Sequence, residues 1–204
     1  GIGIFPRAGL ARLHPDGSLD MSFMPPAQVW VRSLALQPDG KVLAAGHDGD
    51  IRRLNADGSL DSNFQARVGS RAEVYAMLVQ ADGHVLIGGD FSSVNGVPMN
   101  DLARLNVGPP FVNPGSVDFT FDPTRGGEVV GPASEFGEVV ALVRQPDGKL
   151  VIGGQFSGYN GRLRRHVARI HPNGFLDEGF NPGLGTDGQV HALALQPDGK
   201  VLVG

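Results

Sequence analysis

The sequence predicts an all-β protein of the β-propeller class, and three observations support this fold. Two hairpin-like units alternate along the 204 residues, and most copies contain the turn sequence Pro-Asp-Gly or a close variant of it. Glycine occurs 31 times and proline 15 times, which indicates many short elements joined by tight turns. No segment shows the apolar period of a helix, so short strands are the expected elements.

The first unit has the pattern Leu-Ala-Leu-Gln-Pro-Asp-Gly-Lys-Val-Leu. Its copies occupy residues 34–43, 77–86, 142–151 and 193–202. Proline pre-sets the backbone at the turn, and glycine accepts the left-handed conformation that follows. Because the flanks are rich in Val, Leu and Ile, we predict two strands here, named A and B.

The second unit forms another hairpin, with strands C and D, and each copy ends in the pattern Asp-x-x-Phe. Its copies begin at residues 10, 51, 102 and 167, and the third has extra residues in its turn. Four repeats of four strands predict about sixteen strands, and four-stranded units every forty to fifty residues are typical of propeller blades. A stacked solenoid is the alternative, but solenoid repeats are usually shorter or helical. The fold expected is therefore a β-propeller of four-stranded antiparallel blades.

We expect residues 1–204 to form a single domain. The last A–B hairpin, at residues 193–204, and the first C–D hairpin, at residues 10–20, would then form one blade together. Gly1 would supply the second glycine of the Gly-Gly pair that ends the other B strands. A four-bladed ring closed in this way has no exposed sheet edges. The alternative is that the four repeats belong to a larger ring, in which case an incomplete ring could self-associate.

Composition excludes several classes of partner. The net charge is −4 and the isoelectric point about 5.8, so no basic surplus exists to neutralise nucleic-acid phosphates. Cysteine is absent, which excludes disulfides and thiolate metal sites. No apolar run approaches the length of about 18 residues that a membrane span needs, so we predict no membrane insertion.

Several phrases resemble a known repeat. They are Leu-Ala-Leu-Gln-Pro-Asp-Gly-Lys-Val-Leu at 193–202, Phe-Ser-Gly-Tyr-Asn-Gly at 156–161 and Asp-Gly-Ser-Leu-Asp-Ser-Asn-Phe at 57–64. Together they resemble the bacterial delta-60 repeat, a family of propeller domains of unknown function, over essentially the whole chain. The resemblance implies part of a large secreted or cell-surface protein and implies no catalytic activity. The chain departs from the pattern at 107–115 and in the short loop after Gly46.

An arginine in strand C and the aspartate of Asp-x-x-Phe recur in every copy of the second unit. If His14 pairs with Ser18 across the turn, Arg12 faces Asp20, and the same register applies to the other copies. Facing opposite charges stabilise a sheet by about 0.2–1 kcal/mol. We therefore predict four structural ion pairs rather than a ligand clamp: Arg12–Asp20, Arg53–Asp61, Arg104–Asp118 and Arg169–Asp177.

The candidate binding site lies on the face formed by the B–C and D–A connections, because these vary in length and chemistry while the Pro-Asp-Gly turns of the other face do not. One column near the start of strand A varies in chemistry between the repeats, and Trp30 and Tyr159 are added to it as candidates. The candidate ligand-binding residues are Trp30, Arg32, Tyr75, Val140, His191 and Tyr159. The alternative interpretation is an ordinary channel rim that holds water.

The predicted function is a non-enzymatic binding or scaffolding module whose ligand is a glycan or a peptide of a protein partner. No metal, cofactor or catalytic residue is predicted, because the histidines lack ligand spacing and no Gly-x-Ser-x-Gly motif occurs. One alternative is a glycan-active lyase or hydrolase that uses the channel-mouth residues with Glu128 or Glu135. Another is a purely structural spacer that binds nothing.

Overall fold

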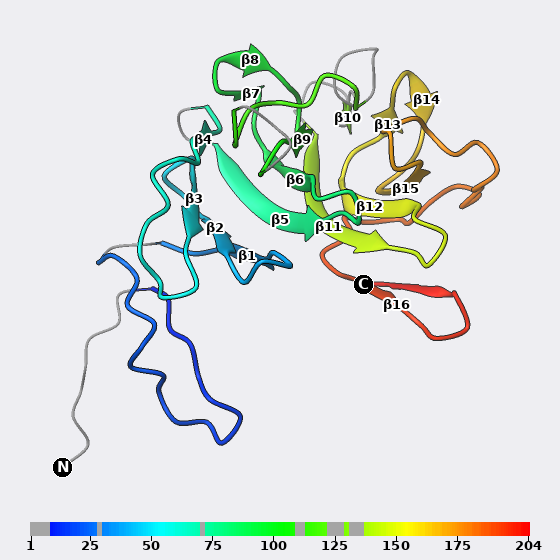
Figure 1. Cartoon of the computed structure of the whole chain (residues 1–204). Helices are drawn as coiled ribbons and strands as arrows, with labels where there is room; N and C mark the ends of the chain where they lie inside the picture. The colour runs from blue at the N-terminus through cyan, green and yellow to red at the C-terminus, as the bar shows by residue number, and fades with distance from the viewer. Residues whose placement is uncertain (1–8, 28–29, 70–71, 109–112, 122–128, 131–136) are drawn as a thin grey trace.

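A computed structural model describes residues 9–27, 30–69, 72–108, 113–121, 129–130 and 137–204. The described residues form only strands, turns and loops, and every strand pair is antiparallel. The main sheets are arranged side by side in the order of the chain (Figure 1). The all-β propeller class predicted from the sequence is therefore confirmed.

The first sheet contains four strands in sequence order. They are β1 (Ser33–Leu36), β2 (Val42–Ala45), β3 (Asp50–Leu54) and β4 (Ala66–Arg67). The β1–β2 turn has the predicted form, because Gln37 N–H donates to the carbonyl of Lys41 and Gly40 adopts a φ of 82°. Such a φ favours glycine, which explains the Pro-Asp-Gly turn at this place.

The second and third sheets repeat this plan. The second contains β5 (Glu73–Val79), β6 (Val85–Asp90) and β9 (Leu102–Leu105). The third contains β11 (Glu138–Arg144), β12 (Leu150–Gln155) and β15 (Val167–Ile170). The pairing register shifts between Val74 and Ala76 and again between Val139 and Ala141. Tyr75 and Val140 are thus the extra residues of two matching β-bulges.

The remaining strands are short. The C-terminal sheet has two strands, β16 (Leu193–Leu195) and β17 (Val201–Val203). The loop after β6 carries a small sheet formed by β7 (Ser93–Val94) and β8 (Val97–Pro98). In the loop after β12, β13 (Gly158–Tyr159) and β14 (Arg162–Leu163) form another small sheet, which β10 (Val129–Val130), a strand that precedes β11, completes.

The predicted outer strand D is reduced to a single bridge in each C–D hairpin. The bridges join Leu13 to Leu19, Leu54 to Leu60, Leu105 to Val117 and Ile170 to Leu176. The strand is this short because the Asp-x-x-Phe turn follows at once, with the phenylalanine N–H donating to the carbonyl of the aspartate in all four copies. The fourth strand of the first sheet, β4, lies beyond this turn.

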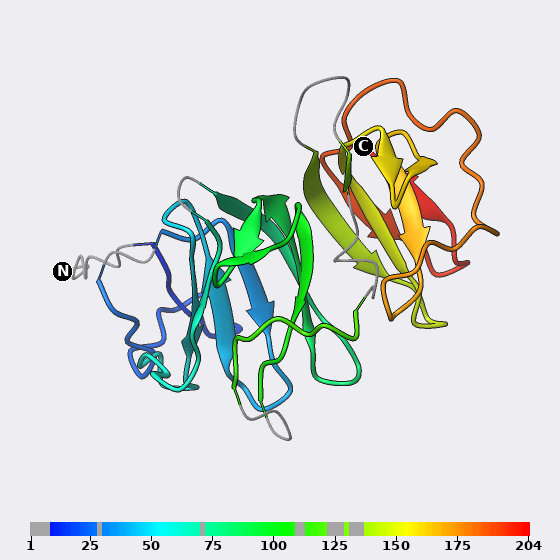
Figure 2. The same ribbon diagram turned by 90° about the horizontal axis from the view of Figure 1, so that it is seen from above.

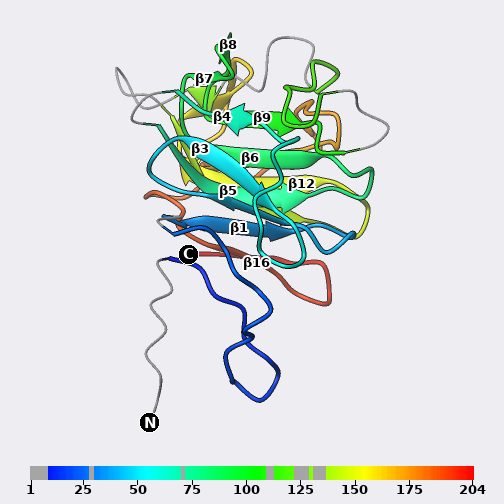
Figure 3. The same cartoon turned by 60° about the vertical axis from the view of Figure 1, so that its left-hand side comes forward.

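The innermost strands contact one another in the order β1, β5, β11 and β16. Figure 2 shows the sheets as a fan, with the N-terminal C–D hairpin (dark blue) at one end and the β16–β17 hairpin (red) at the other. Figure 3 shows the N-terminal hairpin projecting from the body below β1 and β16. The sheets thus follow an open arc, and the closed four-bladed ring stays a prediction. Gly1 lies outside the described residues.

Glycines allow the neighbouring sheets to pack closely. A Cβ atom on Gly88 of β6 would lie 2.6 Å from Cγ1 of Val139, which belongs to the next sheet. Gly153 of β12 is placed in the same way, 2.5 Å from Cγ1 of Val190. Both valines are buried, so the glycines leave the space that the apolar side chains between the sheets occupy.

Candidate functional site

All four predicted ion pairs of the C–D hairpins are present. The arginine Nε lies 2.8 Å, 2.9 Å, 2.7 Å and 2.7 Å from Oδ2 of its aspartate in the pairs Arg12–Asp20, Arg53–Asp61, Arg104–Asp118 and Arg169–Asp177. The register is the one expected, since His14 N–H donates to Ser18 and Asp20 N–H donates to Arg12. These residues therefore hold the two strands of each hairpin together.

Each of these arginines also stacks on the phenylalanine of the same hairpin. The guanidinium carbon lies 4.7 Å, 4.9 Å, 5.1 Å and 4.9 Å from the centre of the ring of Phe23, Phe64, Phe121 and Phe180. A cation over an aromatic face at this distance is stabilised by the ring quadrupole. The Asp-x-x-Phe pattern therefore supplies two partners for one arginine, which makes it a structural motif.

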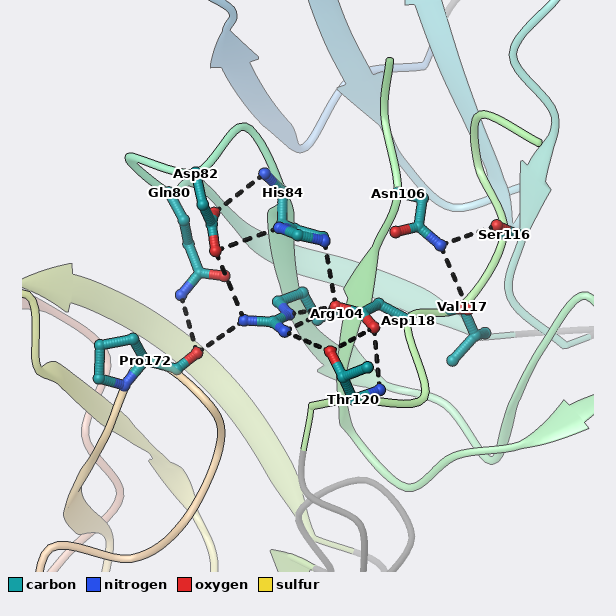
Figure 4. A network of polar contacts seen from close by, with 10 residues as sticks. All are labelled: Gln80, Asp82, His84, Arg104, Asn106, Ser116, Val117, Asp118, Thr120 and Pro172. Atoms are coloured by element: carbon teal, nitrogen blue, oxygen red, sulfur yellow. Dashed lines mark hydrogen bonds and ion pairs between the residues drawn. The ribbon is translucent and has the colours of Figure 1, made fainter. Parts of the chain in front are cut away.

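Figure 4 shows the most extensive of these networks. Arg104 Nη2 lies 2.6 Å from Oδ2 of Asp118 and donates to Oγ1 of Thr120, while Nη1 donates to the carbonyl of Pro172 in the next sheet at 2.8 Å. Nε2 of His84 lies 3.1 Å from the same Asp118 oxygen. Burial raises the pKa of Asp118, but the bonds from Thr120 and the charge of Arg104 outweigh this and lower it. One arginine thus links a hairpin to its own sheet and to the next.

The residues that vary between repeats gather at the other ends of the sheets, where the innermost strands begin. Arg32 precedes β1, and its guanidinium carbon lies 4.6 Å from the ring centre of Tyr75. Its Nη1 also lies 3.6 Å from Oε2 of Glu73, the first residue of β5, and His47 Nδ1 contacts the other Glu73 oxygen. Arg32 and Tyr75, two of the predicted site residues, are therefore brought together.

Four acidic residues lie near this point, within electrostatic reach of one another. We call Glu73, Asp90, Asp101 and Glu138 the carboxylate cluster. Glu73 pairs with Asp90 across β5 and β6, and Asp101 accepts a hydrogen bond from Phe91 N–H at 3.1 Å. Glu138 begins β11 and accepts a bond from Nε2 of Gln189 at 3.3 Å. The cluster therefore spans the second and third sheets.

Burial and mutual repulsion raise the pKa values of this cluster. Burial, opposed by the Phe91 bond and assisted by the charges of Asp90 and Glu138, raises the pKa of Asp101 to about 8. Burial and the neighbouring carboxylates also raise the pKa of Asp90 and of Glu138. A cation placed among carboxylates that repel one another stabilises their ionised forms.

Tyr75 belongs to the same electrostatic environment. Burial first, and then the charges of Glu138, Glu73 and Asp90, raise the pKa of its phenol to about 12, although Arg32 opposes the shift. The phenol therefore stays protonated at neutral pH and can donate a hydrogen bond. Its position as a bulge residue explains why it breaks the alternation of β5.

The other predicted site residues are placed differently. Val140 occupies the matching bulge of β11, half-buried, and His191 is exposed, with its N–H donating to the carbonyl of Gly204. Trp30 is also exposed. Tyr159 is fully buried, and its hydroxyl donates to the carbonyl of Gly174 at 2.6 Å, so it is a core residue that a ligand does not reach. Glu128 and Glu135 lie outside the described residues.

The acidic residues of the cluster are not among those that the sequence predicts for the site, although a signal for them exists. Trp30 lies two residues before Arg32, and the equivalent positions of the next two repeats are Glu73 and Glu138. Reading that column through all repeats would have identified both glutamates. Asp101 carried a different signal, because it has a φ of 63°, but a non-glycine residue in this conformation is recognised only from coordinates.

Metal and membrane sites are not found in the described part of the chain. No group of three or more histidine, aspartate or glutamate side chains is arranged there to hold a metal ion. None of the described residues belongs to a helix with the length and hydropathy of a membrane span.

A hollow away from the carboxylate cluster lies at the outer edge of the first sheet. It is an open groove of about 350 Å³ whose lining includes Leu60, Phe64 and Arg67. The charges beside it neutralise one another, because Arg67 Nη1 lies 2.7 Å from Asp50 and Arg52 Nη2 lies 3.0 Å from the same residue. Since the carboxylate cluster has more acidic than basic groups, it is the stronger candidate.

The arc of repeated antiparallel sheets defines a β-propeller protein. A family model described as a domain of unknown function (DUF5122) beta-propeller matches residues 2–23, 37–64, 80–107 and 145–180, more than half of the chain. The chain belongs to this family. No curated protein matches the sequence.

Solved structures with the same fold share little sequence. A putative oxidoreductase (glucose dehydrogenase) from Thermus thermophilus has a TM-score of 0.58 and 21% identity, over 85% of this chain and 57% of its own. Virginiamycin B lyase from Staphylococcus aureus has a TM-score of 0.54 and 16% identity, over 85% and 48%. A protein of unknown function from Bacteroides caccae has a TM-score of 0.55 and 15% identity, over 95% and 60%. The chain thus spans about half to three-fifths of each, and the likeness shows the fold alone.

Proposed function

We propose that this β-propeller is a non-enzymatic binding module that recognises a ligand with cationic groups, such as a basic peptide segment, at the carboxylate cluster. The observation that carries the proposal is that the charges of Glu73, Asp90 and Glu138, from two sheets, raise the pKa values of their acidic neighbours, with the guanidinium of Arg32 beside Glu73. A ligand ammonium or guanidinium group would relieve their repulsion.

Three features of the site support a peptide ligand over a neutral glycan. The excess of acidic groups favours a positive charge, and the phenol of Tyr75 offers an aromatic face and a hydrogen-bond donor beside it. The site lies where the innermost strands begin, on the face with the variable connections, and rigid sheets hold its side chains. A neutral glycan, which would use Tyr75 and Arg32 without the charges, is the competing outcome.

Isothermal titration with a deca-lysine peptide, a deca-glutamate peptide and a set of neutral oligosaccharides tests the proposal. Of these probes, we expect only deca-lysine to bind. Added salt should weaken its binding because the contacts are ionic. The double variant Asp90→Asn/Glu138→Gln should weaken it by about tenfold or more, which corresponds to about 1.4 kcal/mol. The control Asp39→Asn removes one charge from a β1–β2 turn at the other end of the sheet and should leave the affinity unchanged.

Proton release gives an independent measurement. Because the pKa values of Asp90, Asp101 and Glu138 are raised, a bound cation would favour their ionised forms and expel protons. Titrations near pH 6 in buffers of different ionisation enthalpy would detect this release. Tight binding of a neutral glycan that the double variant does not alter would overturn the proposal.

A glycan-active enzyme is the second candidate, and one observation favours it. Asp101, with its pKa raised to about 8, stays protonated at neutral pH next to other carboxylates, which is the pairing that general acid–base chemistry needs. Its side chain is only 3% exposed, however, so a substrate does not contact it without rearrangement. Release of reducing ends or unsaturated sugars from a polysaccharide panel, lost in Asp101→Asn, would establish this function instead.

We also propose that the protein acts at the cell surface or after secretion. The support is the resemblance of its phrases to the bacterial delta-60 repeat. Fractionation of the source organism with an antibody against the chain tests this location. A protein that binds none of the probes above, and whose variants change only stability, would be a structural spacer.

A further inference from the structure

The loop between β12 and β15 carries basic side chains that the matching loop of the second sheet lacks. We call these residues the basic loop, and they are Arg162, Arg164, Arg165 and His166. In the loop between β6 and β9 the same positions hold Val97, Met99, Asn100 and Asp101. The repeat therefore forms this loop without a cation at any of the four positions.

The backbones of the two loops match, so the comparison is made position by position. Met99 N–H and Arg164 N–H each donate to the carbonyl of the serine near the start of their loop, at 3.1 Å and 2.9 Å. Asp101 and His166 both have a φ of 63°. Met99 is 6% exposed and belongs to the apolar core. Arg164 thus places a charge where the fold is satisfied by an apolar side chain.

The charge of Arg164 is not balanced within the described part of the chain. The side chain is half-buried, and the hydrogen bond described for it runs from Nη1 to the carbonyl of Leu163 at 2.8 Å. Its Nε atom is buried and has no hydrogen-bond partner. Buried polar atoms without a partner are few in folded proteins, and a partly buried charge without a counter-ion is costly. The guanidinium therefore lacks an anion that would offset this cost.

The other members of the basic loop have the same deficit. Nδ1 of His166 is buried and has no hydrogen-bond partner either. Arg162 and Arg165 are exposed, and Arg162 Nη2 lies 3.5 Å from Oε1 of Glu178. That pair contributes little stability, because both side chains are more than two-thirds exposed. Three guanidinium groups and one loosely held carboxylate leave an excess of two positive charges among the described residues.

The basic loop lies on the face with the variable connections. Gln155, the last residue of β12, pairs with Glu138, the first residue of β11, so the loop leaves its sheet at the end where the carboxylate cluster lies. Figure 1 shows β13 and β14 at the same end of the sheets as β7 and β8. Pairing of Arg162 with the buried Tyr159 holds the loop against the core. A rigid sheet thus presents these cations, as it presents the carboxylates beside them.

Guanidinium groups limit the choice of anion. Each offers two parallel N–H donors that match two oxygens of a phosphate, and each stays charged at any physiological pH. A phosphate monoester has a charge of about −1.5 to −2 at neutral pH and three acceptor oxygens, which suits an excess of two positive charges. A sulfate ester or a phosphodiester has a single negative charge. The net charge of −4 also disfavours a long polyanion such as nucleic acid.

We propose that the basic loop is a second binding site, which holds the phosphate group of a phosphate monoester. Arg162 and Arg164 are two residues apart in an extended segment, so they project from the same side and supply the donors. Arg165 adds to the positive potential around them. Because Arg164 is half-buried, water screens its attraction for the phosphate less than at an open surface.

Isothermal titration in phosphate-free buffer tests this site with glucose 6-phosphate, glucose 6-sulfate and glucose. We expect the phosphate ester to bind, the sulfate ester to bind about tenfold more weakly or less, and glucose not to bind. A pentapeptide with a central phosphoserine distinguishes the source of the group. Tighter binding of the peptide would identify a phosphorylated protein, and equal binding would identify the phosphate group itself as the part recognised. Equal binding of the sulfate ester, or tighter binding of a DNA oligonucleotide, would overturn the proposal.

The second sheet supplies the matched substitutions. Arg164→Met and Arg165→Asn introduce the residues that its loop already accommodates at these positions. Arg164→Met should weaken the binding of glucose 6-phosphate by about tenfold or more, and Arg164→Lys, which keeps the charge without the fork, by less. The control Arg144→Gln removes an exposed arginine from the other end of β11 and should leave the affinity unchanged. Wild-type affinity in Arg164→Met/Arg165→Asn would overturn the proposal.

Thermal unfolding separates a ligand site from a structural role. Without ligand, Arg164→Met should melt at the temperature of the wild type or above it, because the unbalanced charge is gone. Glucose 6-phosphate should raise the melting temperature of the wild type and not that of the variant. A variant that melts well below the wild type without ligand would assign Arg164 to the fold and contradict the proposal.

The outcome is independent of the one for the carboxylate cluster. The variant Asp90→Asn/Glu138→Gln should bind glucose 6-phosphate as the wild type does, and Arg164→Met should bind deca-lysine as the wild type does. Loss of phosphate binding in the carboxylate variant would contradict the assignment to the basic loop.

Discussion

The Nζ atom of Lys41 lies 2.6 Å from Oδ2 of Asp61, and through this contact one side chain ties the A–B hairpin of the first sheet to its C–D hairpin. Arg53 shares the same oxygen, at 2.9 Å. Burial raises the pKa of Asp61, but the bonds from Lys41 and from Asn63 N–H, together with the charges of Arg53 and Lys41, lower it on balance. The carboxylate thus contacts cations from two different hairpins.

Replacing Asp61 should therefore be strongly destabilising. Arg53 and Asp61 are only 5% and 4% exposed, and Asp61→Ala would leave a buried guanidinium without its partner. Breaking a buried pair in this way costs about 3–5 kcal/mol. Urea unfolding should show a loss of this size for Asp61→Ala and almost none for Asp187→Ala, which removes an exposed aspartate. Equal effects of the two variants would contradict the structural role of the pair.

The aspartates of these ion pairs should also affect stability in acid, as Asp177 of the third sheet illustrates. Hydrogen bonds from Lys149, opposed by burial and assisted by Arg169, lower the pKa of Asp177 to about 2. A lowered native pKa gives stability that is present above the unfolded value, near 4, and is lost as the pH falls toward 2. Thermal unfolding between pH 5 and pH 2 should show this loss in the wild type and a shallower one in Asp177→Asn. Parallel curves for both proteins would exclude Asp177 as a source of the acid sensitivity.

Asp101 should have the opposite pH dependence. Its pKa is raised to about 8, so the native state holds a proton that the unfolded state has released above pH 4. Stability from this group is therefore present below about pH 4 and is lost as the pH rises to about 8.

Asp101→Asn keeps an acceptor for Phe91 N–H and tolerates the positive φ. The melting temperature of this variant should exceed that of the wild type at pH 8 and match it at pH 4. A gain of the same size at both pH values would indicate a cause other than ionisation.

Gly154 should resist substitution although its φ is ordinary. A Cβ atom there would overlap the carbonyl oxygen of Glu138 on the paired strand β11. Crowding of this kind costs about 1–3 kcal/mol. Gly188→Ala is the matched control, because no atom lies within 4 Å of its added Cβ. Urea unfolding should separate the two variants, and a harmless Gly154→Ala would mean that β11 and β12 adjust more freely than their pairing suggests.

The sequence predicted the features that depend on local chemistry. The turn at Gly40 and the facing of Arg12 and Asp20 follow from residues close together in the chain, so hairpin geometry alone placed them correctly. The sequence did not indicate that Tyr159 is a core residue. Its hydroxyl donates to the carbonyl of Gly174, which only the folded third sheet brings near. The acidic cluster was missed for a related reason: Asp90 and Glu138 belong to different sheets, and their proximity depends on how the sheets pack.

The bulges at Tyr75 and Val140 separate recognition from folding. A bulged residue lies outside the regular pairing, so the strand ladder on either side closes in the same way whichever side chain it carries. The bulge residue is a tyrosine in the second sheet and a valine in the third. Substitutions at these bulge positions can thus change ligand specificity one sheet at a time, because strand pairing in the repeat does not depend on the side chain there.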